Sequence, residues 1–192
     1  KSIGLLHSIN TNVGYQSGWS FYNEWQHRSK ELISYLVAYD LLRGAGMTNI
    51  QMQKAEDSLL AFTSHLYSRS MATYTVYCLQ LKFFSYQVNN HSIMTASALG
   101  LAAIIFNDHG DIDPAYQPLN WINAGFWNLD NTLWMENGNY PRVSESDTLA
   151  GYAEGPNYFE YAFQNAFPFI RAMGNFLSAG NYPVTFNGVT RE

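Results

Sequence analysis

Apolar side chains recur every three or four positions along most of the chain, which is the spacing of one face of an α-helix. The first such stretch covers 19–43, where apolar positions such as Trp25 and Leu36 fall on one face and polar residues occupy the others. Gly44-Ala45-Gly46 follows directly and is typical of a helix end. The pattern therefore predicts an amphipathic helix closed by a glycine turn.

Two further helices are predicted after this turn. Thr48 and Gln51 have the spacing of a capping box, in which each side chain accepts a hydrogen bond from the other residue's backbone. The three-and-four spacing then continues through 52–66. It resumes over 71–87, where Cys78 falls on the apolar face, so we expect a third helix with this cysteine as a small core residue.

The stretch 92–107 carries no charged residue, and before Asn107 it consists of apolar, small and hydroxyl residues. A helix that is apolar on every side must be packed on every side. Asn89-Asn90 precedes it and supplies the type of side chain that caps a helix N-terminus. We therefore expect a buried helix that begins at these asparagines.

Proline marks the start of the last two predicted helices, because its fixed φ and missing N–H suit the first helical position. Asp113-Pro114 introduces one of them, and Gly155-Pro156 introduces the other, over 157–179. Pro168 is expected to kink or divide that final helix. The tail 180–192 is interpreted as a connector or a short strand.

Six periodic segments without clear strands predict an all-α fold. Such segments fit either a helical bundle or helical hairpins stacked into a curved, toroidal array. Periodicity alone does not choose between the two. A length of 192 residues is that of one domain.

Composition narrows the class of partner. Apolar residues make up 47% and charged residues 13% of the chain, which is typical of a globular protein. The net charge of −5 and the lack of a basic cluster argue against nucleic acid as a partner. The longest apolar run, 93–106, is too short to span a membrane, so no membrane partner is expected. The acidic run 108–113 lacks the later glutamate of an EF-hand, and no metal site is predicted.

The first candidate site is Asn89-Asn90-His91, at the mouth of the buried helix. Free backbone N–H groups and the positive end of the helix dipole make such a place favourable for a carboxylate. The alternative is that an asparagine only caps the helix and that His91 is a surface residue. The spacing leaves both interpretations open.

The second candidate site follows the polar stretch 137–153. Glu154-Gly155-Pro156 leads into a helix on which Tyr158 and Tyr161 lie about one turn apart. These tyrosines could serve proton transfer, or they could be core residues with hydroxyls at the surface. Tryptophans, Trp25 among them, could stack on sugar rings or belong to the core.

Together these segments resemble the heparinase II/III and alginate lyase superfamily. The similarity rests on Asn89-Asn90-His91, on the segment from Glu154 to Tyr161, and on 30–42, which resembles an early helix of that family. Members carry an incomplete (α/α) toroid of helical hairpins followed by a β-sandwich. The resemblance therefore implies a partial toroid over 1–180, a connector or the start of a sandwich over 181–192, and a downstream β-sandwich domain of the same parent protein.

The same resemblance implies cleavage of an acidic, uronate-containing polysaccharide by β-elimination, without a cofactor, in a secreted or periplasmic enzyme. Asn90 and His91 would neutralise the substrate carboxylate, and Tyr158 would transfer the proton, with Tyr161 as its nearest rival. Asn89, Glu154 and Trp25 would contact substrate. The family supplies a further histidine, and the other histidines here match no such position: His7, His27, His65 and His109.

Two alternatives remain open at the level of sequence. A toroidal glycoside hydrolase would use a pair of carboxylates such as Glu154 and Asp147 as acid and base. A noncatalytic glycan-binding fragment would need neither.

Overall fold

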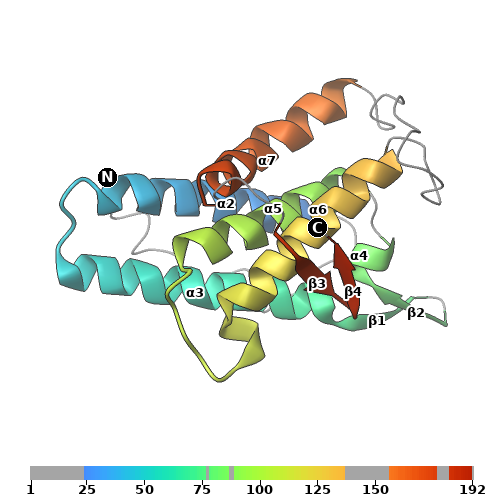
Figure 1. Cartoon of the computed structure of the whole chain (residues 1–192), viewed down its shortest axis with the longest axis horizontal. Helices are drawn as coiled ribbons and strands as arrows, with labels where there is room; N and C mark the ends of the chain where they lie inside the picture. Colours follow the sequence, from blue (N-terminus) through green and yellow to red (C-terminus); the bar gives the residue numbers. More distant parts are fainter. Residues whose placement is uncertain (1–23, 77, 87–88, 137–155, 177–181, 192) are drawn as a thin grey trace.

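The computed structural model describes residues 24–76, 78–86, 89–136, 156–176 and 182–191, which are mostly helical, as the sequence predicts (Figure 1). The long helices are α2 (Glu24–Arg43), α3 (Asn49–Met71), α5 (Asn90–Ile105), α6 (Pro118–Glu136) and α7 (Pro156–Phe176). The short elements are β1 (Thr73–Val76), β2 (Leu79–Lys82), α4 (Phe83–Tyr86), the 3-10 helix η1 (Pro114–Tyr116), β3 (Val184–Phe186) and β4 (Val189–Arg191).

The turn between α2 and α3 forms as its residues predict. Gly46 adopts a φ of 85°, which glycine tolerates without steric cost. At Thr48 both halves of the capping box are present: the Gln51 backbone N–H donates to Thr48 Oγ1 at 3.3 Å, and the Thr48 N–H donates to Gln51 Oε1 at 3.1 Å. The two helices therefore form an antiparallel hairpin, which the Tyr39 hydroxyl ties together by donating to Glu56 Oε2 at 3.2 Å.

The predicted third helix is wrong. Strands β1 and β2 form an antiparallel hairpin there, in which Val76 pairs with Leu79, and a single helical turn, α4, follows. Threonine, tyrosine and valine dominate β1, and these residues favour a pleated strand over a helix. Cys78 is not a core residue but an exposed one at the hairpin turn, with a φ of 67°.

Other boundaries differ by smaller amounts. Asn89 caps α5 as predicted, and the helix is buried along nearly its whole length. Asp113 and Pro114 begin only the short helix η1, and α6 starts separately at Pro118. Pro168 lies inside α7 without dividing it. The tail forms the short antiparallel pair β3 and β4, so its interpretation as a strand is confirmed.

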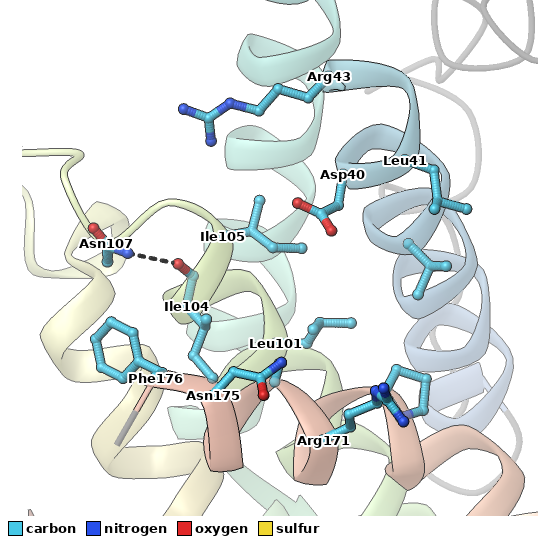
Figure 2. A pocket seen from close by; sticks show the side chains of 13 residues that line it. Asp40, Leu41, Arg43, Leu101, Ile104, Ile105, Asn107, Arg171, Asn175 and Phe176 are labelled. Carbon is cyan, nitrogen blue, oxygen red and sulfur yellow. Dashed lines mark hydrogen bonds between the residues drawn. The ribbon is translucent and has the colours of Figure 1, made fainter. Parts of the chain in front are cut away.

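Helices α2 and α5 run in the same direction. Contacts between them advance together along both sequences: Asn90 Nδ2 donates to Gln26 Oε1, and one turn later the hydroxyls of Ser29 and Thr95 lie 2.9 Å apart. Helix α7 follows this direction as well, because its C-terminal half lies with those of α2 and α5 around one cavity (Figure 2). These three helices therefore share a direction.

Helix α6 runs opposite to α5, and α3 runs opposite to α2. The Thr132 hydroxyl near the end of α6 donates to the Ser92 hydroxyl near the start of α5 at 3.1 Å. Farther along, Gly125 lies directly against the backbone of Ala96 and Gly100. Successive long helices thus alternate in direction, and α5 contacts all the others (Figure 1).

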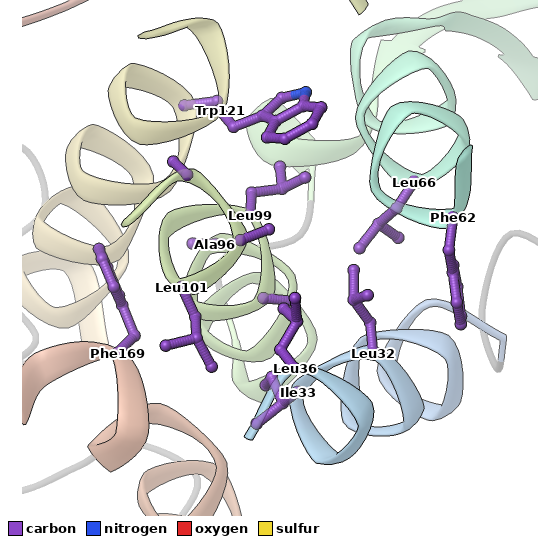
Figure 3. Packing of buried hydrophobic residues seen from close by; sticks show 14 of the residues in the cluster. Leu32, Ile33, Leu36, Phe62, Leu66, Ala96, Leu99, Leu101, Trp121 and Phe169 are labelled. Atoms are coloured by element: carbon purple, nitrogen blue, oxygen red, sulfur yellow. The ribbon is translucent and has the colours of Figure 1, made fainter. Parts of the chain in front are cut away.

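The hydrophobic core surrounds α5. Figure 3 shows side chains from every long helix meeting there, among them Leu36 of α2, Leu66 of α3, Leu99 of α5, Trp121 of α6 and Phe169 of α7. All five are fully buried. Burying a large apolar side chain stabilises a fold by roughly 1.5–3 kcal/mol, so this cluster holds the helices in their mutual positions.

The C-terminal strands pack on α6. The Thr185 backbone N–H donates to Asn123 Oδ1 at 3.2 Å, and the rings of Phe186 and Trp127 lie 5.5 Å apart. Phe84 of α4 meets Phe186 edge to face. The tail is therefore attached to the helical body.

Candidate active site

The N-terminus of α5 is formed by the first predicted motif. Asn89 Oδ1 accepts a hydrogen bond from the backbone N–H of His91 at 3.1 Å, so Asn89 is the N-cap. The Asn89 carbonyl accepts from Ser92 and Ile93, the first bonds of the helix. The capping interpretation is thus confirmed for Asn89, while the predicted substrate contacts of this motif remain predictions.

Asn90 faces α2. This residue is only 1% exposed. Its Nδ2 donates to Gln26 Oε1 at 3.4 Å, whereas N–H···O bonds usually measure about 2.7–3.2 Å. His91, one position later, is half-buried. Both residues stand in the first turn of α5, where the helix dipole favours negative charge.

The second predicted motif lies on the first turns of α7. Tyr158 is 51% exposed, while Tyr161 is partly buried. The ammonium of Lys30 lies 5.4 Å from the centre of the Tyr161 ring, the geometry of a cation–π contact. A positive charge from α2 therefore stands beside this tyrosine.

The two motifs meet on one face of α2. Gln26 and Lys30 are four residues apart and so are neighbours on that helix. Gln26 contacts Asn90, and Lys30 contacts Tyr161. The start of α5 and the start of α7, which are about 70 residues apart in sequence, are thus bridged by one helical turn of α2.

Trp25 belongs to the core. Its side chain is 1% exposed, and its ring packs 4.4 Å from that of Phe83 and edge to face with Tyr74 at 6.2 Å. A sugar ring could reach it only if these neighbours moved. Glu154 is the predicted substrate contact, and Glu154 and Asp147 are the carboxylates of the hydrolase alternative. Both residues lie outside the part of the chain that the structure describes.

Sequence reasoning missed Gln26 and Lys30. Both fall on the polar side of the predicted helix, where most residues only face solvent. Their partners are 64 and 131 positions away, and the pattern around α2 carries no signal for contacts at that separation. These residues meet their partners because α2, α5 and α7 pack side by side and run in the same direction.

Comparisons of the chain with protein-family models, with curated proteins and with solved structures found no match. Among the described residues, no helix is long and apolar enough to cross a membrane, and no group of three or more His, Cys, Asp or Glu side chains could hold a metal ion.

Proposed function

We propose that this chain is the toroid part of a polysaccharide lyase that cleaves a uronate-containing glycan by β-elimination. The observation that supports this most is the bridge on α2, where Gln26 contacts Asn90 and Lys30 contacts Tyr161. It joins the two motifs on which the resemblance to the heparinase II/III and alginate lyase superfamily rests. The residues to which we give catalytic roles below therefore lie near one turn of α2.

A toroid of helical hairpins suits the alternation of helix directions. In such an array every second helix runs the same way, as α2, α5 and α7 do, and the intervening helices α3 and α6 run back. The ends of the parallel helices then form one rim of the toroid. In this proposal the candidate active site lies at the rim that carries their N-terminal turns.

The substrate carboxylate would be neutralised at the start of α5. Asn90 is 1% exposed, so a carboxylate would have to displace the Gln26 side chain, which accepts from Asn90 through a long bond of 3.4 Å. His91 and the positive end of the helix dipole would add to the neutralisation, and Lys30 supplies a full charge. Withdrawing electrons in this way makes the C5 proton of the sugar acidic.

Tyr158, starting as its phenolate, would then take the C5 proton and become the neutral hydroxyl. The C5–H electrons form the C4=C5 double bond, the C4–O glycosidic bond breaks, and its oxygen leaves with a proton returned by the same hydroxyl. The exposure of Tyr158 lets its hydroxyl reach a sugar without rearrangement. Tyr161 is the rival, because Lys30 lies over its ring.

Elimination is detected by the ultraviolet absorbance of the new double bond. The chain is assayed against alginate, heparan sulfate, chondroitin, hyaluronan and glucuronans, both alone and joined to the downstream β-sandwich that the resemblance implies, where the parent protein carries one. Tyr158→Phe should remove most of the rate while leaving oligomer binding nearly unchanged, since only a hydroxyl is lost. Tyr161→Phe is the matched comparison, and a larger rate loss there would move the role to Tyr161.

The carboxylate-binding role has its own test. His91→Gln should lower the chemical step by about 10²-fold, the usual scale for losing a preorganised donor. Asn90 is buried, so Asn90→Ala is interpreted only if its unfolding midpoint stays near that of the wild type. New reducing ends without absorbance would contradict elimination and favour the hydrolase, and no cleavage of any polymer by the longer protein would reject both.

A further inference from the structure

A cavity opens at the opposite end of the three parallel helices. It lies between the C-terminal halves of α2 and α7, with α5 as its floor, and has a volume of about 500 Å³. Figure 2 shows Asp40 and Leu41 on one wall and Arg171 and Asn175 on the other. Binding sites for small molecules measure roughly 300–1,000 Å³, so the cavity is large enough for a ligand.

The cavity lies on the same interface, or seam, between α2 and α7 as the Lys30–Tyr161 contact. On each helix, positions one turn apart lead from that contact to the cavity. These positions are 30, 34, 37 and 41 on α2, and 161, 165, 168 and 172 on α7. Ten residues separate Tyr161 from Arg171, which at about 1.5 Å per residue is roughly 15 Å. The cavity and the Lys30–Tyr161 contact therefore lie along the same pair of helices.

Polar side chains with complementary hydrogen-bonding capacity line the cavity. Arg43 and Arg171 offer several N–H donors, Asp40 is an acceptor, and the amides of Asn107 and Asn175 can act as both. In the described part of the chain, no ion pair within 4.0 Å joins the Asp40 carboxylate to either arginine. Its oxygens can thus accept hydrogen bonds from a ligand.

The remaining lining is apolar. Leu101, Ile104 and Ile105 form part of the floor, and the ring of Phe176 is 41% exposed. Phe176 and Asn107 also border a second cavity of about 130 Å³ on the other side, so the ring stands between two hollows. An exposed aromatic ring beside planar polar groups suits a ligand with an apolar face and polar edges.

The charges of the cavity nearly cancel. Two guanidinium groups face one carboxylate, and the C-terminal ends of α2, α5 and α7 each add roughly −0.5 charge from the helix dipole, so the net charge is close to zero. The start of α5, by contrast, carries the positive end of the dipole with Lys30 nearby. An anion would therefore be favoured at the start of the helices and an uncharged polyhydroxyl group at their ends.

We infer that this cavity is a distal subsite that binds one sugar unit of the glycan through its hydroxyl groups and its C–H face, without needing its carboxylate. Asp40 accepts from the hydroxyls, Arg171 and Asn175 donate to them, and Phe176 packs against the ring. The inference rests on the proposed function for the choice of a glycan as the ligand.

The probes are uronate oligomers of graded length and the same oligomers with every carboxylate reduced to an alcohol. Calorimetric titration of the full chain should show that the reduced oligomers still bind. Asp40→Ala should weaken their binding by about tenfold or more, because hydrogen bonds to a charged group are lost. Phe176→Ala should weaken it by roughly two- to tenfold, the scale of an aromatic contact. Asp57→Ala and Phe167→Ala change exposed residues outside the cavity and should bind as the wild type does.

Each result bears on one proposal separately. Failure of the reduced oligomers to bind, or wild-type affinity in both Asp40→Ala and Phe176→Ala, overturns the subsite, and the lyase proposal then stands or falls on its own absorbance assay. The subsite is also overturned if the reduced oligomers bind the His91→Gln variant less tightly than the Asp40→Ala variant, since they would then occupy the start of α5. Cavity-dependent binding without elimination of any polymer supports the subsite and rejects the lyase.

Discussion

Two helix interfaces of this molecule are built in opposite ways: the interface of α5 with α6, here called the closed seam, and the interface of α2 with α7, here called the open seam. Between α5 and α6 the backbones touch: a Cβ added at Gly125 would lie 2.6 Å from the Ala96 carbonyl oxygen and 2.7 Å from the Gly100 nitrogen. Between the C-terminal halves of α2 and α7 the helices instead leave a cavity of about 500 Å³. The first seam has no room for one methyl group, and the second has room for a ligand.

The difference follows from the side chains at each seam. Small residues on α5 and α6 let the helices approach until only backbone and hydroxyl groups separate them, as at Ser92 and Thr132. Long polar side chains at the ends of α2 and α7, such as Arg43 and Arg171, cannot be buried without partners, so they line an open space. Rigid packing thus supports α5, and the polar seam beside it stays open.

The largest expected effect is at the closed seam. Gly125→Ala places a methyl group against backbone atoms, which cannot rotate away, so α6 must shift. Overpacking costs typically 1–3 kcal/mol and sometimes more, and we expect about 3 kcal/mol or more here. Urea unfolding followed by circular dichroism measures the loss.

Gly100→Ala is the companion variant. Its added methyl would overlap the Phe169 ring, a side chain rather than backbone. Phe169→Leu in the same protein should recover part of the loss, whereas it should not rescue Gly125→Ala. Equal rescue of both, or a free energy of unfolding within about 0.5 kcal/mol of wild type for Gly125→Ala, the range of a neutral surface change, would contradict the closed seam.

The closed seam could be predicted from sequence only in part. The uncharged stretch of small residues predicted a helix buried on all sides, and α5 is one. Which glycine lies against which backbone could not be read, because Gly100 and Gly125 meet through tertiary packing. The β1–β2 hairpin was missed because Tyr74 and Cys78 also fit a helical spacing over so short a run.

The candidate site was predictable to a similar degree. Asn89 could be identified as a cap because capping depends on local sequence. The contacts of Asn90 and Tyr161 depend on Gln26 and Lys30, which no local pattern distinguishes from a solvated helix face. The cavity at the other end was not predicted at all, since its walls come from three helices.

Alkaline pH tests how firmly one wall of the open seam is held. Asp40 lines the cavity, while Tyr39 beside it is 1% exposed and bonds to Glu56 of α3. Burial, and then the charge of Glu56 and its hydrogen bond, raise the pKa of Tyr39 from 10.0 to about 12. The folded state therefore keeps this proton at pH values where the unfolded chain has lost it.

Because the folded pKa is the higher one, the stabilisation is complete below pH 10 and is lost as the pH rises toward 12. Two pKa units correspond to about 2–3 kcal/mol. Burial also raises the pKa of Tyr67 and Tyr74, so the wild type and Tyr39→Phe share that part of the loss. Urea titrations at pH 8, 10 and 11.5 should show a steeper decline for the wild type than for Tyr39→Phe, and parallel declines would mean that Tyr39 does not hold this wall.

The smallest effect is expected in the last turn of α7, beside the open seam, from the same change that is most damaging at the closed one. Gly174 lies in the last turn of α7, and a Cβ added there would meet no described atom within 4 Å. Alanine has a higher helix propensity than glycine and restricts the unfolded chain, so Gly174→Ala should stabilise the protein by up to about 0.5–1 kcal/mol. The measurement is the urea midpoint at pH 8, beside Gly125→Ala in the same series. A loss of stability at Gly174 would mean that the end of α7 is packed against something, and the contrast between the two seams would then fail at its open side.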